Sequence, residues 1–256
     1  MITCRSAAEI ERLAQVNALV AQVLRELMGA VAVGVTTRQL DALAERRLRE
    51  GRAEPAFKGY HGYPATICAS VNEQVIHGIP NDRPLQEGDI LSIDLGGKLE
   101  GYFGDSAVTV PVGRVSVDAD RLLTVTQAAL ERAIAVVRPG ARVHDIGAAV
   151  QQHVEAHGYA VVREFVGHGI GTALHEEPQI PNYGTPGRGS RLAAGMVLAI
   201  EPMVNIGKAA VKVLSDGWTA VTKDGSLSAH FEHTVAVTET GCRVLTERDQ
   251  VVAEAV

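Results

Sequence analysis

An internal repeat is the feature that most constrains how this chain of 256 residues folds. The order helix, glycine, helix, glycine, strands occurs twice, over about residues 7–110 and 119–245. Gly88-Asp-Ile-Leu-Ser-Ile-Asp94 overlays Gly195-Met-Val-Leu-Ala-Ile-Glu201, so each half has a carboxylate six residues after a glycine, at the end of an apolar run. Such runs are typical of buried strands. A duplicated α+β unit would bring the equivalent carboxylates together near a pseudo-two-fold axis, whereas the alternative is coincidence between two ordinary strands.

Each half is predicted to begin with two helices. Ser6-Ala-Ala-Glu9 forms a capping box before an apolar stripe at steps of three and four, which predicts the start of the first helix. The second helix follows Gly34 and stops at Gly51. In the second half, helices are expected over about 119–137 and up to Gly158, so Gly34 matches Gly140 and Gly51 matches Gly158 to within one residue.

Strands are predicted after each pair of helices. Residues 65–110 are rich in Val and Ile, with turns expected at Asn81-Asp82 and Gly96-Gly97, and strands resume later and continue to about Leu245. No linker-like stretch separates the halves. We therefore expect a single domain over residues 1–256.

Charge and cysteine content exclude several classes of protein. The formal net charge of −6 argues against a general nucleic-acid-binding surface. Three scattered cysteines favour a reducing compartment. Charged residues interrupt the first dozen positions, and no uncharged run reaches transmembrane length, so neither a signal peptide nor a membrane span is expected. These features predict a soluble, cytoplasmic protein.

Four carboxylates and one histidine are the strongest candidates for chemistry. Most of them lie in or beside apolar runs, and carboxylates are rarely buried without a partner. Converging acidic groups would repel one another unless cations neutralised them, and an oxygen-rich set with one imidazole suits divalent ions. Taken singly, each glutamate could instead be a solvated residue at a strand end. The candidates are Asp94, Asp105, His168, Glu201 and Glu232.

The spacing of the two aspartates adds to this prediction. Asp94 and Asp105 are separated by an odd number of positions, as directly opposed residues of a hairpin with an even loop must be. Their side chains would then project from one face of a sheet. Two adjacent aspartates in a sheet are destabilising without a positive charge between them, although a solvated pair near a hairpin is the alternative.

Three histidines extend the candidate site. His168 stands between glycines, which allow close backbone approach, but the stretch lacks the G-x-G-x-x-G spacing of a dinucleotide loop. His77 and His175 could hydrogen-bond a substrate and its transition state, although each alone could be a turn or core histidine. Neither a G-x-S-x-G elbow nor a Cys/His signature occurs, so a metal-bound water is the expected nucleophile.

Together these segments resemble the type I methionine aminopeptidases, which have the pita-bread fold of the creatinase/aminopeptidase family. The resemblance runs from about Ser6 to Thr246 and is most specific in residues 58–64, 71–80, 167–171, 175–178 and 216–233. It implies an α+β fold with two pseudo-symmetric helix-helix-sheet halves around a central dinuclear metal site. It also implies that residues 1–256 form one catalytic domain.

The resemblance assigns a role to each candidate. The five residues above would be the metal ligands, with Asp105 and Glu232 bridging and Glu201 also handling the proton of the water. His77 and His175 would contact the substrate. The walls of a methionine pocket would be Tyr60, Tyr63, Cys68 and Trp218.

Two further sets of residues follow from the resemblance. Phe57 and Leu174 occupy pocket positions where the family varies, and an aromatic residue is common where Leu174 stands. Backbone oxygens near three residues resemble a monovalent-cation site of some members. These residues are Asn72, Gln74 and Ser228.

The implied activity is removal of the initiator methionine from nascent polypeptides when the second residue is small, by a metal-activated water. Two divalent ions would be needed, drawn from Co, Mn, Fe or Zn. We expect a monomer that binds neither nucleic acid nor membrane, and leave ribosome association open. One alternative is a prolidase-like or X-Pro aminopeptidase, which usually carries an extra N-terminal domain. The other is a non-catalytic binding module, which usually lacks some of the ligands.

Overall fold

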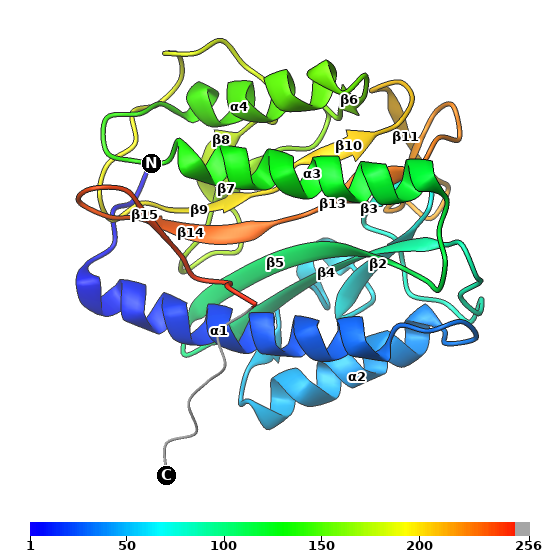
Figure 1. Ribbon diagram of the computed structural model, residues 1–256. Helices are drawn as coiled ribbons and strands as arrows, with labels where there is room; N and C mark the ends of the chain where they lie inside the picture. Colours follow the sequence, from blue (N-terminus) through cyan, green and yellow to red (C-terminus); the bar gives the residue numbers. More distant parts are fainter. Residues whose placement is uncertain (249–256) are drawn as a thin grey trace.

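The computed structural model describes residues 1–248 and has an α+β architecture. Figure 1 shows one pair of helices along each side of the molecule, with the strands between the two pairs. The first pair covers the strands of the first half, and the second pair covers those of the second half. The helices are α1 (Ala7–Ala30), α2 (Thr37–Glu50), α3 (Val117–Ala135) and α4 (Val143–Ala156), with a short 3-10 turn η1 (Tyr60–Gly62).

The first half is built on one antiparallel sheet. Strand β4 is central, with β2 and β5 as neighbours and β1 pairing near its end. Helix α1 packs on β4 and β5. The bounds are β1 (Glu54–Pro55), β2 (Ile67–Val71), β4 (Ile90–Leu99) and β5 (Tyr102–Pro111).

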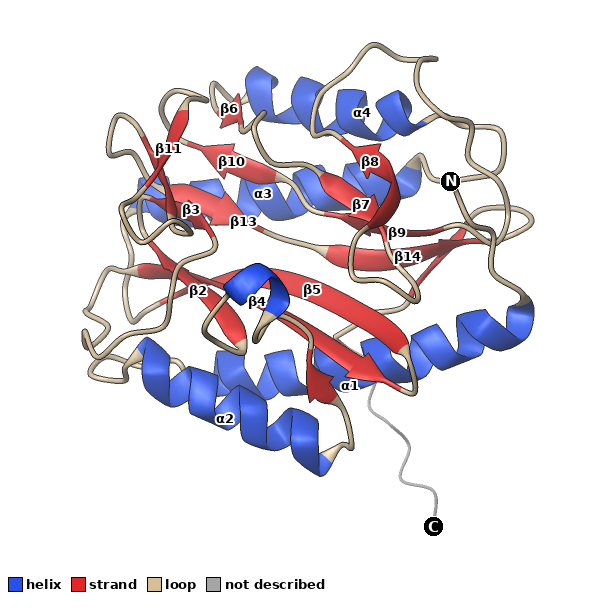
Figure 2. Ribbon diagram, turned by 180° about the vertical axis from the view of Figure 1, so that it is seen from behind, coloured by secondary structure: helices blue, strands red, loops and turns tan. Residues whose placement is uncertain are grey.

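The second half has a larger sheet in the order β15-β14-β9-β7-β8, seen from behind in Figure 2. A smaller sheet has the order β13-β10-β6. The bounds are β6 (Ala160–Val161), β7 (Gly167–Gly169), β8 (Glu176–Ile180), β9 (Val197–Ile200), β10 (Met203–Asn205), β13 (Ser228–His230), β14 (His233–Val237) and β15 (Cys242–Val244).

Two connections join the halves. Strand β3 (Gln74–Ile76) of the first half pairs with β12 (Ala220–Thr222) of the second, and β12 in turn pairs with β11 (Val211–Val213). Strand β5 also contacts β14 and the residue just before it: the Glu232 N–H donates to the Ala107 carbonyl at 2.9 Å, and the Thr234 hydroxyl donates to the Asp105 carbonyl at 2.8 Å. These bonds satisfy buried backbone groups and fix two acidic segments side by side.

The helix starts predicted from the sequence are confirmed. At α1, the Glu9 N–H donates to the Ser6 hydroxyl and the Ser6 N–H donates to the Glu9 carboxylate, at 3.3 and 2.9 Å, which is the expected capping box. Inward-facing residues such as Leu24 and Leu48 are fully buried. Burial of each such side chain stabilises the fold by about 1.5–3 kcal/mol.

The backbone conformation supports the internal repeat. Gly34 and Gly140 have φ of 90° and 88°, and Gly88 and Gly195 both have φ of 91°. These positions precede equivalent elements in the two halves, namely α2 and α4 for the first pair and β4 and β9 for the second. A positive φ is readily adopted only by glycine, so the repeated glycines mark turns that both halves need.

The match between Gly51 and Gly158 requires a shift of one residue. Helix α4 ends with Gly158 at φ 81°, and the residue in the same left-handed conformation after α2 is Arg52, at φ 62°. Each helix ends with the same two backbone hydrogen bonds. After α2, the Ala53 N–H donates to the Leu48 carbonyl and the Arg52 N–H to that of Arg49. After α4, the Tyr159 N–H donates to the Val154 carbonyl and the Gly158 N–H to that of Glu155. This is a Schellman motif at each end, with arginine where the second half has glycine.

The turn predicted at Gly96-Gly97 is wrong, because β4 continues through both glycines. The chain reverses instead at Glu100 and Gly101, with φ of 49° and 86°, as in a two-residue type I′ hairpin. The glycines serve close packing: a Cβ at Gly96 would lie 2.9 Å from the Cβ of Ala56.

The direct opposition predicted for Asp94 and Asp105 is also wrong. Asp94 pairs with Ala107, and Asp105 pairs with Gly96. The two aspartates are therefore offset by two residues, which keeps both side chains on the same face of the sheet. The predicted shared face holds, and the register differs because the turn is centred on Glu100 and Gly101, one residue beyond the centre that direct opposition would need.

Among residues 1–248, no helix combines the length and apolar character needed to cross a membrane.

Candidate metal centre and substrate pocket

The structure places all five predicted metal ligands around one cavity of about 250 Å³. Each of these side chains is buried, with only 2–8% of the residue exposed. They come from separate elements of both halves: β4, β5, β7, the end of β9, and the segment between β13 and β14. Ligand atoms of Asp105, His168 and Glu232 lie within 4.8 Å of one another, a spacing that one cation could span.

His168 is oriented as a ligand. Its Nδ1 lies 2.9 Å from the Gly169 carbonyl oxygen, and since a carbonyl can only accept, Nδ1 carries the proton. The Nε2 lone pair then faces the acidic groups, at 3.6 Å from Glu201 Oε1 and 4.0 Å from Asp105 Oδ2. Burial, together with the nearby His175, lowers the pKa of His168 to about 3, so the ring is neutral. A carbonyl that fixes the tautomer is typical of metal-binding histidines.

The carboxylates repel one another in the absence of a cation. Burial raises the pKa of Asp94 to about 7. Burial, with the charges of Glu232 and Asp94, raises the pKa of Asp105 well above its usual range. The pKa values of Glu201 and Glu232 are raised for the same reasons, burial first and neighbouring carboxylates second. Four acidic groups in one dry site need positive charge to ionise together.

Orphaned polar atoms show where such charge fits. Among the described residues 1–248, three buried carboxylate oxygens have no hydrogen-bond partner: Asp94 Oδ1, Asp105 Oδ1 and Glu232 Oε1. Buried polar atoms are normally paired, since each unpaired one costs about 1–3 kcal/mol. All three belong to residues that line the cavity. Oxygen ligands with one neutral imidazole suit divalent ions such as Mn, Fe, Co or Zn, so the residues fit the predicted group.

The predicted pocket walls line the same cavity as the acidic cluster. The Tyr63 hydroxyl donates to the carbonyl oxygens of Ile67 and Gly78, each at 3.0 Å. Its ring meets that of Trp218 edge-on, with centroids 5.1 Å apart. Cys68 is buried opposite Asp94 in the β2–β4 pair, and burial raises the pKa of its thiol, so it forms a neutral wall.

The other expected wall residues behave differently. Tyr60 is half-buried, and its hydroxyl lies 2.8 Å from His175 Nδ1, so it also restrains a histidine. Phe57 and Leu174 are buried and line the cavity. Ile76 lines it as well and was not expected from the sequence.

The two predicted substrate histidines lie at the edge of the acidic cluster. His175 is exposed as a whole residue, but its ring packs against that of His168, with centroids 4.3 Å apart. His77 follows β3, has a left-handed backbone at φ 61°, and packs edge-on against Phe165 at 5.5 Å. Burial lowers the pKa of His77 to about 4, and burial with the neighbouring His61 lowers the pKa of His175. Both rings are therefore neutral near pH 7.

Two histidines at the site, His230 and His61, were not predicted from the sequence. His230 is buried at the end of β13, and its Nε2 lies 3.6 Å from Glu201 Oε2. A signal was present, because His230 is two residues from Glu232 and strand alternation puts both on one side. His61 lines the cavity mouth from the 3-10 turn, where no periodic pattern could locate it.

The residues expected at a monovalent-cation site are brought together in part. The Ser228 N–H donates to the Asn72 carbonyl at 2.9 Å. Gln74 uses its side-chain oxygen to accept the Val71 N–H at 2.9 Å. Binding of a cation at this place stays a prediction.

Comparisons with known proteins identify the family of this chain. Residues 11–239 match the profile of metallopeptidase family M24. The chain is 51% identical over 246 residues to methionine aminopeptidase 1 of Bacillus subtilis, covering 96% of this chain and 99% of that protein. The crystal structure of methionine aminopeptidase from Thermotoga maritima superposes with a TM-score of 0.95 at 47% identity, covering 96% of this chain and all of that one.

Prolidases share the fold at lower identity. Prolidase from Pyrococcus furiosus has a TM-score of 0.78 and 22% identity, with 96% of this chain covering 66% of that one. The expected pita-bread fold is thus confirmed by neighbours of both kinds. On the profile match and the identity to full-length relatives, this chain belongs to metallopeptidase family M24.

Proposed function

We propose that this M24 metallopeptidase is a methionine aminopeptidase that removes the first residue of nascent polypeptides when the second residue is small. The observation that carries the proposal is a single cavity lined by both the acidic cluster and the apolar pocket walls. A metal-dependent exopeptidase needs the scissile bond beside the cations and the first side chain in a pocket next to them. The full-length relatives named methionine aminopeptidase support the same substrate.

Two divalent cations are proposed as cofactors, taken from Mn, Fe, Co or Zn. The residues that would hold them share burial, oxygen or imidazole donors, and a position on the cavity wall; they are Asp94, Asp105, His168, Glu201 and Glu232. Asp105 and Glu232 approach each other closely across the two halves, so both would take part in holding the cations. Cations bound there supply Lewis acidity, which polarises a peptide carbonyl and lowers the pKa of water.

The chain's own groups then bind and move protons. The Glu201 carboxylate, placed between His168 and His230, is assigned to accept a proton from the attacking water and return it to the departing amine. Neutral His77 and His175 are assigned to donate hydrogen bonds to the scissile amide and its developing oxyanion. For His175, the Tyr60 hydroxyl at Nδ1 leaves Nε2 free to act as the donor.

The pocket explains the preference for methionine. A flexible thioether suits a wall of Tyr63, Trp218 and Cys68, and each sulfur–aromatic contact contributes about 0.3–1.5 kcal/mol. The second substrate residue must pass beside the acidic cluster, so bulk there should clash. Leu174 stands where the family commonly has an aromatic residue, and we expect the pocket to admit norleucine or leucine slightly better for that reason.

A peptide panel with varied first and second residues tests the proposal. With Mn²⁺ or Co²⁺ added, Met-Ala-Ser should be cleaved with a kcat/KM at least tenfold above that of Ala-Ala-Ser or Met-Leu-Ser. Equal rates for Met-Ala-Ser and Met-Leu-Ser would contradict it. A preference for Xaa-Pro peptides would instead support a prolidase-like enzyme, and binding without cleavage would support a non-catalytic module.

The proposal includes a monomer acting in the cytoplasm on nascent chains. Light scattering of the purified protein measures the first point. Co-sedimentation with ribosomes at low and physiological salt decides whether substrate delivery involves the ribosome.

A further inference from the structure

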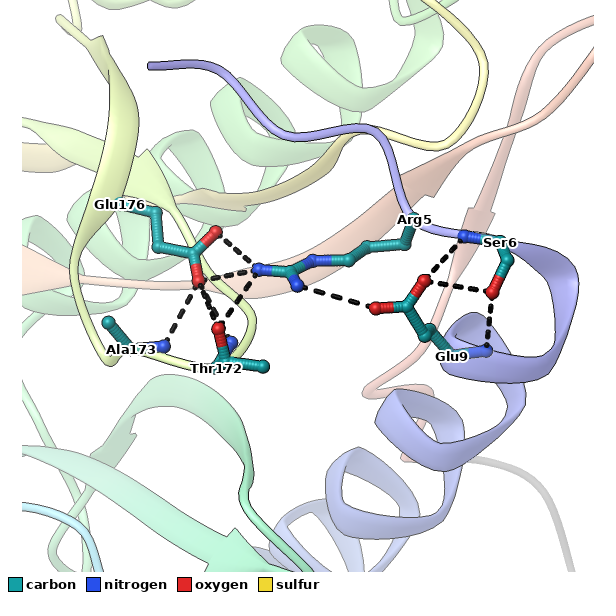
Figure 3. Close-up of polar contacts among 6 residues, drawn as sticks. All are labelled: Arg5, Ser6, Glu9, Thr172, Ala173 and Glu176. Atoms are coloured by element: carbon teal, nitrogen blue, oxygen red, sulfur yellow. Dashed lines mark hydrogen bonds and ion pairs between the residues drawn. The ribbon is translucent and has the colours of Figure 1, made fainter.

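The segment before α1 lies against the loop that carries His175. The Arg5 N–H donates to the Gly195 carbonyl at 2.7 Å. The Arg5 side chain is only 8% exposed, and its Nη2 donates to both carboxylate oxygens of Glu176, at 2.6 and 2.7 Å (Figure 3). Glu176 directly follows His175 in the chain, so this ion pair is one residue away from a proposed substrate contact.

The Glu176 carboxylate also closes the loop itself. One of its oxygens accepts the N–H groups of Thr172 and Ala173, at 2.8 and 3.0 Å, as Figure 3 shows. Burial alone would raise the pKa of Glu176, but the Ala173 N–H and the Arg5 guanidinium outweigh it and lower the pKa. Charge-assisted bonds of this kind are shorter and stronger than neutral ones, so the loop over 172–176 is held in one conformation.

Arg5 fits this place closely. A Cβ on Gly171 would clash with the Arg5 guanidinium, so any larger residue there would displace the guanidinium from its present place. On its other side, Arg5 Nη1 lies 3.4 Å from Glu9, the residue that closes the capping box of α1. The guanidinium therefore links the start of α1 to the loop between β7 and β8.

The link matters for the cavity because the loop carries two residues that line it. Leu174 is buried in the cavity wall, and the His175 ring lies against that of His168. Tyr60 restrains the far side of the His175 ring, whereas the backbone of His175 is restrained through Glu176. A shift of about 1 Å in a substrate-positioning group can cost up to about a hundredfold in rate.

We propose that Arg5 is a positioning residue for the peptidase reaction, acting through Glu176 on the loop that presents Leu174 and His175 to the substrate. The inference rests on the proposed function, because His175 has its substrate role only there.

Steady-state kinetics on Met-Ala-Ser with Mn²⁺ tests it. Arg5→Met, which keeps length and removes charge, should lower kcat about tenfold while KM and metal content change less than threefold. Arg5→Lys should recover part of the loss. Glu176→Gln keeps an acceptor for the two loop N–H groups and removes the charge that pairs with Arg5, so it should cause the same loss of kcat. It serves as the test if Arg5→Met folds poorly.

The matched control is Arg243→Met. Arg243 of β15 pairs with Glu11 of α1 at 2.6 Å, but the two side chains are 49% and 64% exposed, and neither residue lines the cavity. This variant should have wild-type kcat.

Two further measurements separate positioning from general stabilisation. In a His175→Ala background, Arg5→Met should cause no additional loss of kcat, whereas an equal loss there would overturn the inference. In metal-free protein, hydrogen exchange at the Thr172 and Ala173 amides should be at least tenfold faster in Arg5→Met than in wild type or Arg243→Met. Unchanged exchange would overturn the inference. If the wild-type protein cleaves no N-terminal methionine, the proposed function is wrong. Hydrogen exchange at the Thr172 and Ala173 amides would still decide whether Arg5 holds the loop.

Discussion

At the residue scale, the environment of Glu201 suits it for two tasks. One carboxylate oxygen faces the neutral His168 and the other faces the neutral His230, both at 3.6 Å. The Asn182 amide donates to the Glu201 backbone carbonyl at 3.0 Å, which fixes the chain just after β9. The backbone next to the carboxylate is thus fixed, and the carboxylate itself remains available to a cation and a proton.

Replacing Glu201 with Gln should therefore abolish most activity without unfolding the protein. The amide keeps the shape but loses the charge that holds a cation and accepts a proton, and loss of a general base costs about a hundredfold or more in rate. The check is kcat at saturating Mn²⁺ with a melting curve as the control for folding. Turnover within a few-fold of wild type would remove Glu201 from the catalytic set.

Substitution of His77 should lower the catalytic rate without lowering the metal content, unlike substitution of a metal ligand. His77→Ala removes one hydrogen-bond donor to the transition state, which typically costs about 2.7–4 kcal/mol, or about a hundredfold or more in kcat. Metal content, measured by elemental analysis after dialysis, should stay at the wild-type level. Lost metal with retained kcat would show that His77 is a ligand and that its assigned role is wrong.

At the scale of elements, the C-terminal ends of α2 and α4 have the same motif but differ at one residue. Arg52 and Gly158 adopt the same left-handed conformation in the same motif, yet only one is glycine. A side chain in this conformation costs about 1–2 kcal/mol relative to the usual backbone region. Arg52 is exposed, so little packing offsets that cost.

Arg52→Gly should thus stabilise the protein, by about 1 kcal/mol after the extra entropy of the unfolded glycine is counted. For a chain of this size, that raises Tm by about 2–4 °C. Gly158→Ala is the mirror control and should lower Tm, because a Cβ there meets nothing within 4 Å and the effect is purely that of the backbone. A destabilised Arg52→Gly would mean that the arginine side chain makes a compensating contact.

At the scale of the whole molecule, both halves bury carboxyl groups at the metal centre, and ionising these groups without a cation destabilises the fold. In metal-free protein, burial raises the pKa of Asp94 to about 7, against an ordinary value near 3.9. The folded state therefore binds more protons than the unfolded state between about pH 4 and 7. The stability that this group contributes is present at low pH and is lost as pH rises through its folded pKa.

Added metal should reverse this trend. Cations need deprotonated ligands, so the rise in Tm caused by Mn²⁺ should be small at pH 5 and larger at pH 8. Differential scanning calorimetry of chelated and reloaded protein measures the difference at each pH. Full activity after chelation, with metal loss verified, would exclude a metal-dependent mechanism, and a pH-independent Tm shift would place the cations elsewhere.

The sequence by itself determined the features that depend on local periodicity and on turns. Helix starts, the repeated glycines and the acidic residue at the end of each apolar run all follow from rules that act within a few residues. For that reason, the matched segments ending at Asp94 and Glu201 could be paired from the sequence alone. The resemblance carried by several short motifs supplied the family and fold, which the comparisons confirm.

Only the tertiary structure decided which distant groups meet. The hairpin register that offsets Asp94 from Asp105 depends on the packing of Gly97 against α1 and α2, and packing of that kind leaves no local signal. The contacts of His230 with Glu201 and of Arg5 with Glu176 join positions far apart in the chain. Side chains from both halves converge because the sheets bury their apolar faces together, and burial depends on the whole fold and not on neighbours in sequence.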